Sequence, residues 1–215
     1  MSRFVKGMLF GFGLILGTTI ILGVLFIRSM QPDAEQEKIV KRQAEAYLEQ
    51  HYKEAEVVDV YFDNMGNHVA FDYAAQVIDR KTGIEFLVYL DQSTNKVVDT
   101  YYVEQWTADV VVVIQPSVGA VFGNDADYLV HFAEESVMAL KLQPGAEVDY
   151  RDTKIPPTIS ITLHRKQQTT DKKRLNNLST TLQSNNYLSH GKIQVEYVDE
   201  DGELFEGGEE LKAVF

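Results

Sequence analysis

Residues 84–98 read IEFLVYLDQSTNKVV. Apolar side chains at every second position from Ile84 to Leu90 are typical of a strand with one buried face. Polar residues 92–96 then predict a turn, in which Asn95 suits a left-handed backbone position, and the valines that follow begin another strand. Because a short turn joins neighbouring strands, the stretch predicts an antiparallel hairpin.

Two earlier segments extend this hairpin into a four-stranded sheet. Residues 57–62 and 69–77 show strand patterns and are separated by a stretch rich in turn-forming residues. The fourth strand is expected to continue as far as Trp106. Adjacent residues of a strand point to opposite faces, so one of Tyr101 and Tyr102 is expected to be exposed and available as a binding contact.

A helix is expected ahead of these strands. Asp33 and Gln36 have the spacing of a capping box, and apolar residues follow at helical intervals. This pattern predicts a helix over residues 34–52. Residues 33–107 are therefore expected to form one helix laid across a four-stranded antiparallel meander.

This layout resembles the PepSY and cystatin-like modules of bacterial envelope proteins. The resemblance is carried by the order of one helix and four strands and by the segment FLVYLDQSTNKVV, residues 86–98. Such modules commonly have a Thr-Gly-Lys turn, and Asn95 stands here where glycine is usual. The resemblance implies a non-catalytic domain that binds or restrains another envelope protein, often a peptidase. With its apolar N-terminal segment, the chain also resembles single-pass membrane proteins of Bacillota.

Residues 108–215 are expected to form a second, smaller α+β unit, which places the whole chain in the α+β class. Leucines at helical spacing predict a helix over residues 170–185. Near the start of this second unit, residues 108–114 fit either a short helix or a strand. Pro116 is expected to interrupt whichever of the two forms. The expected strands are residues 128–133, 158–164, 193–198 and 203–205, the last two forming a hairpin.

An uncharged apolar run occupies residues 7–27. As a helix it would reach about 30 Å, the thickness of the hydrocarbon core of a bilayer. A cleaved signal peptide usually has a shorter apolar region and a small-residue cleavage site, which is missing here, and a buried helix of a water-soluble domain seldom runs this long without a charge. Residues 1–32 are therefore predicted to be a short basic head and a single transmembrane helix.

The orientation of this helix rests on two opposing arguments. Lys and Arg residues are more numerous after the helix than before it, which favours a cytoplasmic C-terminal side. Long domains, however, cross the membrane largely regardless of charge, and a short basic head is the layout of a signal anchor. We expect a cytoplasmic N-terminus and extracytoplasmic domains, a location that also suits a chain without cysteine.

The membrane helix could also pair with a second copy. Gly13 and Gly17 have the G-x-x-x-G spacing that lets two membrane helices approach closely. Glycine is common in such helices for other reasons. The chain could thus form a homodimer through this helix, as an alternative to a monomer in the membrane.

The net charge of −12 narrows the choice of partners. Residues 33–107 carry −8 and residues 108–215 carry −7, so both modules are acidic. Binding to phosphate backbones needs a basic face, and nucleic acid is therefore not expected as a partner.

Basic residues nevertheless gather in the stretch that follows the strand expected at residues 158–164. Arg165, Lys166, Lys172, Lys173 and Arg174 surround the start of the predicted helix and are candidates for contact with an anionic surface. The competing interpretation is a solvated helix face. An acidic stretch at residues 199–203 fails the calcium-loop pattern and is read as a hairpin turn around Asp-Gly.

Motifs for catalysis are missing from the sequence. The histidines form no H-E-x-x-H pair, and there is no nucleophile elbow, phosphate-binding glycine loop or cysteine. No catalytic, cofactor-binding or metal-binding residue is therefore predicted. The function expected is a membrane-tethered, extracytoplasmic module that binds or regulates an envelope protein. The alternatives are a self-associating NTF2-like envelope subunit and a membrane-anchored hydrolase that uses acidic residues.

Overall fold

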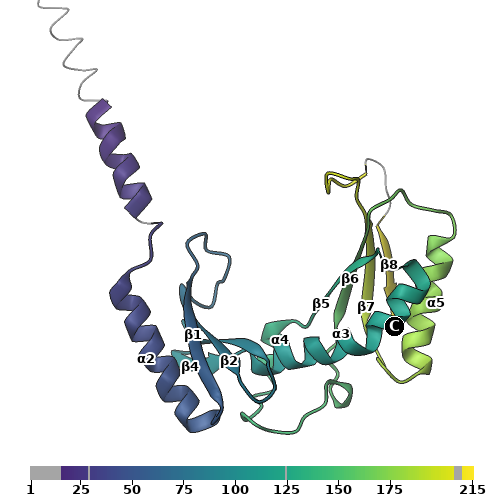
Figure 1. The fold of residues 1–215 in the computed structure, drawn as a ribbon, viewed down its shortest axis with the longest axis horizontal. Coiled ribbons are helices and arrows are strands. Elements are labelled where there is room, and N and C mark those ends of the chain that lie inside the picture. The colour runs from purple at the N-terminus through teal and green to yellow at the C-terminus, as the bar shows by residue number, and fades with distance from the viewer. Residues whose placement is uncertain (1–15, 29, 124, 206–209) are drawn as a thin grey trace, which may run out of the picture. The chain divides into compact units, whose positions relative to one another are not determined.

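The chain divides into two compact units, each combining helices with a four-stranded sheet (Figure 1). One contains the residues up to Lys81 together with Leu87–Asp99, and the other contains Thr82–Phe86 and Thr100–Phe215. This arrangement confirms the α+β class. The computed structural model describes residues 16–28, 30–123, 125–205 and 210–215.

The N-terminal apolar segment is described in part. Residues 16–28 are helical, whereas residues 7–15 of the predicted anchor lie outside the described residues. Among the residues that are described, no helix is both long enough and apolar enough to cross a bilayer. The helix exposes its large apolar side chains, which are Leu16, Ile20, Ile21, Leu22, Val24, Leu25, Phe26 and Ile27.

Helix α2 (Ala34–His51) agrees with the predicted helix over residues 34–52. The carboxylate of Asp33 accepts a hydrogen bond from the N–H of Glu35 at 2.7 Å and so caps the first turn. Ala44 and Leu48, two members of the expected apolar stripe, are buried. The helix contacts β1, β2 and β4 of the first sheet, whose bounds follow.

The first sheet is the antiparallel meander that the sequence predicts. Its strands lie in the order β1-β2-β3-β4, with Val60 opposite Ala75 and Val88 opposite Asp99. Asn95 adopts a φ of 53° in the last turn, which confirms the expected left-handed position. The strands are β1 (Ala55–Phe62), β2 (Tyr73–Asp79), β3 (Glu85–Asp91) and β4 (Lys96–Asp99).

The second strand begins later than predicted, at Tyr73 rather than at residue 69. Residues 63–72 instead form a connection that we call the β1–β2 loop. The carboxylate of Asp63 accepts hydrogen bonds from the N–H groups of His68 at 2.5 Å and Met65 at 3.4 Å. These bonds hold the backbone in a compact loop, in competition with strand pairing.

The predicted strand up to Trp106 is wrong. The strand β4 ends at Asp99, and the next element is a long helix, α3 (Tyr101–Phe122), which continues through Pro116. Aromatic and β-branched residues favour strands, but here burial at every fourth position decides in favour of a helix. The buried residues at this spacing are Tyr102, Trp106, Val110, Ile114 and Val118.

The expected exposed tyrosine is also wrong, because both Tyr101 and Tyr102 are buried. In a helix, adjacent side chains are not forced to opposite faces as they are in a strand. The hydroxyl of Tyr102 donates to the carbonyl groups of Gln143 and Ala146, each at 2.8 Å. The ring of Tyr101 packs edge-on against Phe86, with 5.3 Å between the ring centroids.

The second sheet is mixed and has the order β5-β6-β7-β8. The crossover through helix α5 makes β6 and β7 parallel, whereas the two outer pairs are antiparallel. Val198 and Leu204 form only an isolated bridge, and β8 replaces the predicted last strand at residues 203–205. The remaining elements are β5 (Asp127–His131), α4 (Glu134–Met138), the 3₁₀ turn η1 (Tyr150–Asp152), β6 (Thr158–Leu163), α5 (Asp171–Ser184), β7 (Lys192–Tyr197) and β8 (Leu211–Val214).

The core of the second unit lies between this sheet and its helices. The leucines of α5 are buried, as the helical pattern predicts, and so are the alternating apolar residues of the central strands β6 and β7; α5 contacts α3 and β8. Trp106 of α3 is fully buried, and its indole N–H donates to the carbonyl of Val148 at 3.0 Å. The fully buried aliphatic side chains of this core include Ile159, Ile161, Leu175, Leu178, Leu182, Ile193 and Val195.

Candidate functional site

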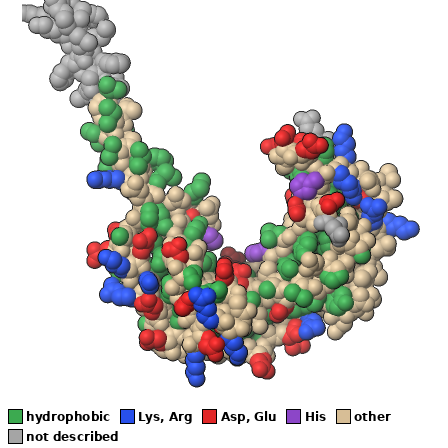
Figure 2. Space-filling model, in the orientation of Figure 1, with side chains coloured by type: hydrophobic (Ala, Val, Ile, Leu, Met, Phe, Trp, Pro, Cys, Tyr) green, Lys and Arg blue, Asp and Glu red, His purple; other side chains and the backbone are tan. Residues whose placement is uncertain are grey.

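The five basic residues predicted to meet an anionic surface lie in the second unit, in the loop between β6 and α5 and in the first turn of α5. We call this group the basic corner, and its members are Arg165, Lys166, Lys172, Lys173 and Arg174. Figure 2 shows Lys and Arg side chains gathered over the start of α5 and the loop before it. The fold therefore brings together residues that the sequence places in two separate runs.

Two of these cations surround a buried carboxylate. The guanidinium of Arg165 donates to both oxygens of Asp171, at 2.8 and 2.9 Å, and Arg174 contacts the same carboxylate at 3.4 Å. The side chain of Asp171 is completely buried. Asp171 also accepts a hydrogen bond from the N–H of Gln168 at 2.9 Å. Arg165 thus has a structural role in the loop before α5.

Electrostatic conditions at Asp171 follow from these contacts. Burial would raise the pKa of Asp171, but the hydrogen bonds from Arg165 and from the N–H of Gln168 outweigh it, and its pKa lies below the ordinary value. Burial and the nearby Asp171 carboxylate raise the pKa of Tyr197 to about 12. The guanidinium of Arg165 also lies over the ring of Tyr197, 5.9 Å from its centroid. The carboxyl group of Asp171 is thus held ionised at neutral pH.

The remaining cations of the basic corner point to solvent. Lys172 and Lys173 are exposed in the first turn of α5, and the ammonium of Lys166 lies 5.7 Å from the centroid of the Phe205 ring. Next to them, the ring of His164 pairs with Asp127 at 2.7 Å. Exposed lysines attract anions through charge rather than through a shaped site, so the corner can support weak, salt-sensitive contacts.

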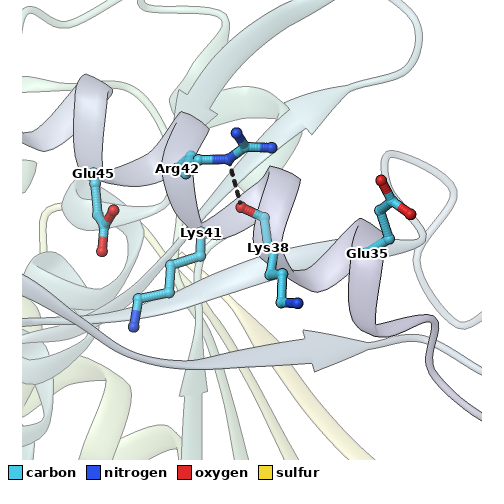
Figure 3. A pocket seen from close by; sticks show the side chains of 5 residues that line it. All are labelled: Glu35, Lys38, Lys41, Arg42 and Glu45. Carbon is cyan, nitrogen blue, oxygen red and sulfur yellow. Dashed lines mark hydrogen bonds between the residues drawn. The ribbon is translucent and has the colours of Figure 1, made fainter.

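A second charged surface lies on α2 in the first unit. Glu35, Lys38, Lys41, Arg42 and Glu45 line a hollow on the exposed face of this helix (Figure 3). Along the helix three cations lie between two carboxylates, and the side chains point away from the helix in different directions, without converging on one point. Arg42 donates to the carbonyl of Lys38 at 3.3 Å, one turn earlier. This arrangement is that of a solvated helix face.

Within the described ranges, no group of three or more His, Cys, Asp or Glu residues could hold a metal ion. Burial and the neighbouring Glu134 raise the pKa of Glu104. The acidic stretch after β7 forms the predicted turn, because Asp199 accepts hydrogen bonds from the N–H groups of Asp201 and Glu203, both at 3.0 Å.

The predicted helix-pairing residues are only partly described. Gly13 lies outside the described residues, whereas Gly17 belongs to the helix over residues 16–28. A Cβ atom added at Gly17 would meet nothing within 4 Å. The surface of the helix is therefore open at Gly17.

The β1–β2 loop is a candidate surface that sequence reasoning missed. It exposes Met65 and Val69, whose relative exposures are 75% and 95%. The sequence pattern predicts Val69 in a strand, because this residue alternates with Phe71. The Asp63-Asn-Met-Gly-Asn67 sequence, which is rich in turn-forming residues, is the signal that this loop extends further.

Comparisons with known proteins leave the family open. No protein-family model and no curated protein matches the chain. A crystal structure of a DUF5037 family protein from Ruminococcus gnavus ATCC 29149 is similar over 81% of this chain and 90% of its own, with 13% sequence identity and a TM-score of 0.36. Similarity at that level carries no argument about function.

Proposed function

We propose that the chain is a membrane-tethered module that binds another protein of the cell envelope and performs no chemistry of its own. One observation carries this proposal, namely that eight large apolar side chains are exposed together on the helix over residues 16–28. The N-terminus would lie in the cytoplasm and the two α+β units outside the membrane.

The exposed helix supports a lipid environment on physical grounds. Contiguous exposed apolar surface is unusual on proteins surrounded by water and usually marks a surface covered by a partner or by lipid. The helix belongs to an uncharged run of residues 7–27, long enough to match the hydrocarbon thickness of a bilayer. A bilayer covers every side of such a helix, whereas a protein groove would cover one side.

The use of buried carboxylates supports binding rather than catalysis. Asp63 accepts backbone N–H groups within the β1–β2 loop, Asp79 accepts the N–H of Lys81 at 2.8 Å, and Asp171 holds Arg165. Each of these carboxylates stabilises the local fold, and none converges with a nucleophile or a second acid in a cavity. Acidic surfaces on both units leave a protein with a complementary basic region as the preferred partner.

Membrane extraction and protease accessibility test the tether and its orientation. The wild-type chain should remain in membranes after alkaline carbonate treatment, and its two units should be cut by protease added to intact cells. Leu16→Lys places a charge within the apolar run and should weaken retention. Gln31→Lys, beyond the run, is the matched control and should be retained. Release of the wild-type chain by carbonate would refute the tether, and protection until lysis would refute the orientation.

Self-association through the apolar helix is the alternative to a separate partner. Cross-linking in intact membranes distinguishes the two. A cross-linked adduct with a different protein supports the binding module. A self-dimer lost on replacing Gly13 and Gly17 with leucine would favour the assembly subunit instead.

A further inference from the structure

The β1–β2 loop presents apolar side chains to solvent at a defined place. Val69 has the highest exposure among the large apolar residues of the described chain, at 95%, and Met65 follows it in the same loop at 75%. Residues 64–71 carry no Asp, Glu, Lys or Arg. The next turn of the meander, between β2 and β3, does carry charged side chains, those of Arg80 and Lys81. Residues 64–71, between Asp63 and Asp72, thus form an uncharged tip with two exposed apolar side chains on a strongly acidic module.

Internal contacts hold this loop in shape. The carboxylate of Asp63 binds two N–H groups of the loop and is itself buried. The ring of His68 stacks on Phe71, with 4.6 Å between centroids and 18° between planes, and meets Tyr61 edge-on. Because its backbone and rings are fixed, the loop can present Met65 and Val69 without losing much conformational freedom on binding.

The base of the loop lies beside the start of α2. The hydroxyl of Tyr73, the first residue of β2, accepts a hydrogen bond from the N–H of Asp33 at 2.8 Å. Figure 1 shows the loop at the same end of the module as the first turn of α2. Asp33 follows Arg28 by five residues, which span at most about 18 Å when extended. The loop therefore lies near the point where the chain leaves the apolar run.

We propose that the β1–β2 loop inserts Met65 and Val69 into the surface of the same bilayer that holds the N-terminal helix. This proposal rests on the proposed membrane tether. An uncharged tip fits the boundary between headgroups and acyl chains, where apolar side chains bind and charges are disfavoured. A second contact of this kind fixes the tilt of the first module on the membrane.

Site-directed fluorescence quenching tests this contact in the full chain. The chain contains no cysteine, so Met65→Cys and Val69→Cys each give one attachment point for an environment-sensitive dye. Gln50→Cys is the matched control, because it is exposed and uncharged and lies in the last turn of α2, away from Asp33. Each labelled chain is reconstituted into phosphatidylcholine–phosphatidylglycerol vesicles that contain brominated acyl chains.

Dyes at residues 65 and 69 should be quenched at least twofold more than the dye at residue 50. Quenching equal to that at residue 50, in a chain that floats with the vesicles, would overturn the loop contact and leave the tether intact. A chain that does not float would overturn the tether itself.

Discussion

Removal of the Arg165 guanidinium is expected to destabilise the second unit, because it leaves a buried carboxylate without its main partner. Asp171 is completely buried and receives two hydrogen bonds from Arg165, at 2.8 and 2.9 Å. After Arg165→Ala, the N–H of Gln168 at 2.9 Å and the longer contact from Arg174 at 3.4 Å would remain. These donors compensate the charge only in part.

The size of the effect follows from this geometry. Removing one partner of a buried ion pair costs about 3–5 kcal/mol. The Arg165→Ala loss should lie at the lower end of this range, because two donors to Asp171 remain and the Arg165 side chain is 28% exposed. The free energy of unfolding should therefore fall by about 3 kcal/mol. Lys173→Ala removes the same charge from an exposed position and should change stability by less than about 0.5 kcal/mol.

Tryptophan fluorescence during urea unfolding measures the difference. Trp106 is the single tryptophan and is fully buried in the same unit, so its emission reports the unfolding of this unit in the full chain. Urea is suitable because it does not screen ion pairs as guanidinium chloride does. A loss below about 1 kcal/mol, or one equal to that of Lys173→Ala, would refute the reasoning. Adding Asp171→Asn to Arg165→Ala should recover part of the loss, and a further loss would also refute it.

The same pair sets a pH dependence. The pKa of Asp171 is lowered in the folded state, so its stabilisation is complete above the ordinary aspartate value of about 3.9 and is lost as the pH falls through the folded pKa. Without Arg165, burial dominates and the carboxylate is more easily protonated. The stability difference between wild type and Arg165→Ala should therefore shrink as the pH is lowered from 7 towards about 3. A constant difference would contradict this account.

Substitutions at three further positions test other contacts by circular dichroism during urea unfolding. Tyr47→Phe removes a hydroxyl that donates to Asp99 at 2.5 Å and should cost about 1–2 kcal/mol. Asn95→Gly should change stability by less than about 0.5 kcal/mol, because glycine suits a φ of 53°, whereas Asn95→Val should cost about 1–2 kcal/mol. Trp106→Phe should cost about 2 kcal/mol, because it opens a cavity and leaves the carbonyl of Val148 without its donor. Unchanged unfolding curves for Tyr47→Phe, Asn95→Val or Trp106→Phe would contradict these expectations.

The sequence predicts the first meander well because its signals are local. Alternation over residues 84–90 and a turn at Asn95 fix both the strands and their antiparallel pairing, and Asp33 marks the start of α2. These features depend on neighbours within a few residues, so local propensity and tertiary packing agree.

Helix α3 could not be predicted in the same way, because its local and tertiary signals disagree. Its aromatic residues and the run Val110–Ile114 have strand propensity, and Pro116 is expected to end a helix. Burial of Tyr102, Trp106 and Val118 at multiples of four residues overrides both signals. Only the packing of the complete unit shows whether the buried residues of this segment follow the spacing of a helix or that of a strand.

The basic corner was predicted as a set of residues, but its internal pairing was not. Arg165 and Asp171 belong to different sequence features, a basic run at a strand end and an acid at a helix start. Their two hydrogen bonds form because the loop after β6 returns the chain to the first turn of α5. A count of charges cannot show that one cation serves the fold while Lys172 and Lys173 face solvent.

The proposed tether would change what the surfaces of the two units need to provide. Apart from Met65 and Val69 in the β1–β2 loop, exposed large apolar residues outside the N-terminal helix include Val58, Val112 and Leu129, which lie on β1, α3 and β5. Single residues of this kind do not form the buried centre that a tight interface between two freely diffusing proteins requires. A partner held in the same membrane would meet the units at high effective concentration, so weak contacts made by charged surfaces would be enough. On this argument the proposed anchor and the acidic surfaces of the two units belong to one mode of binding.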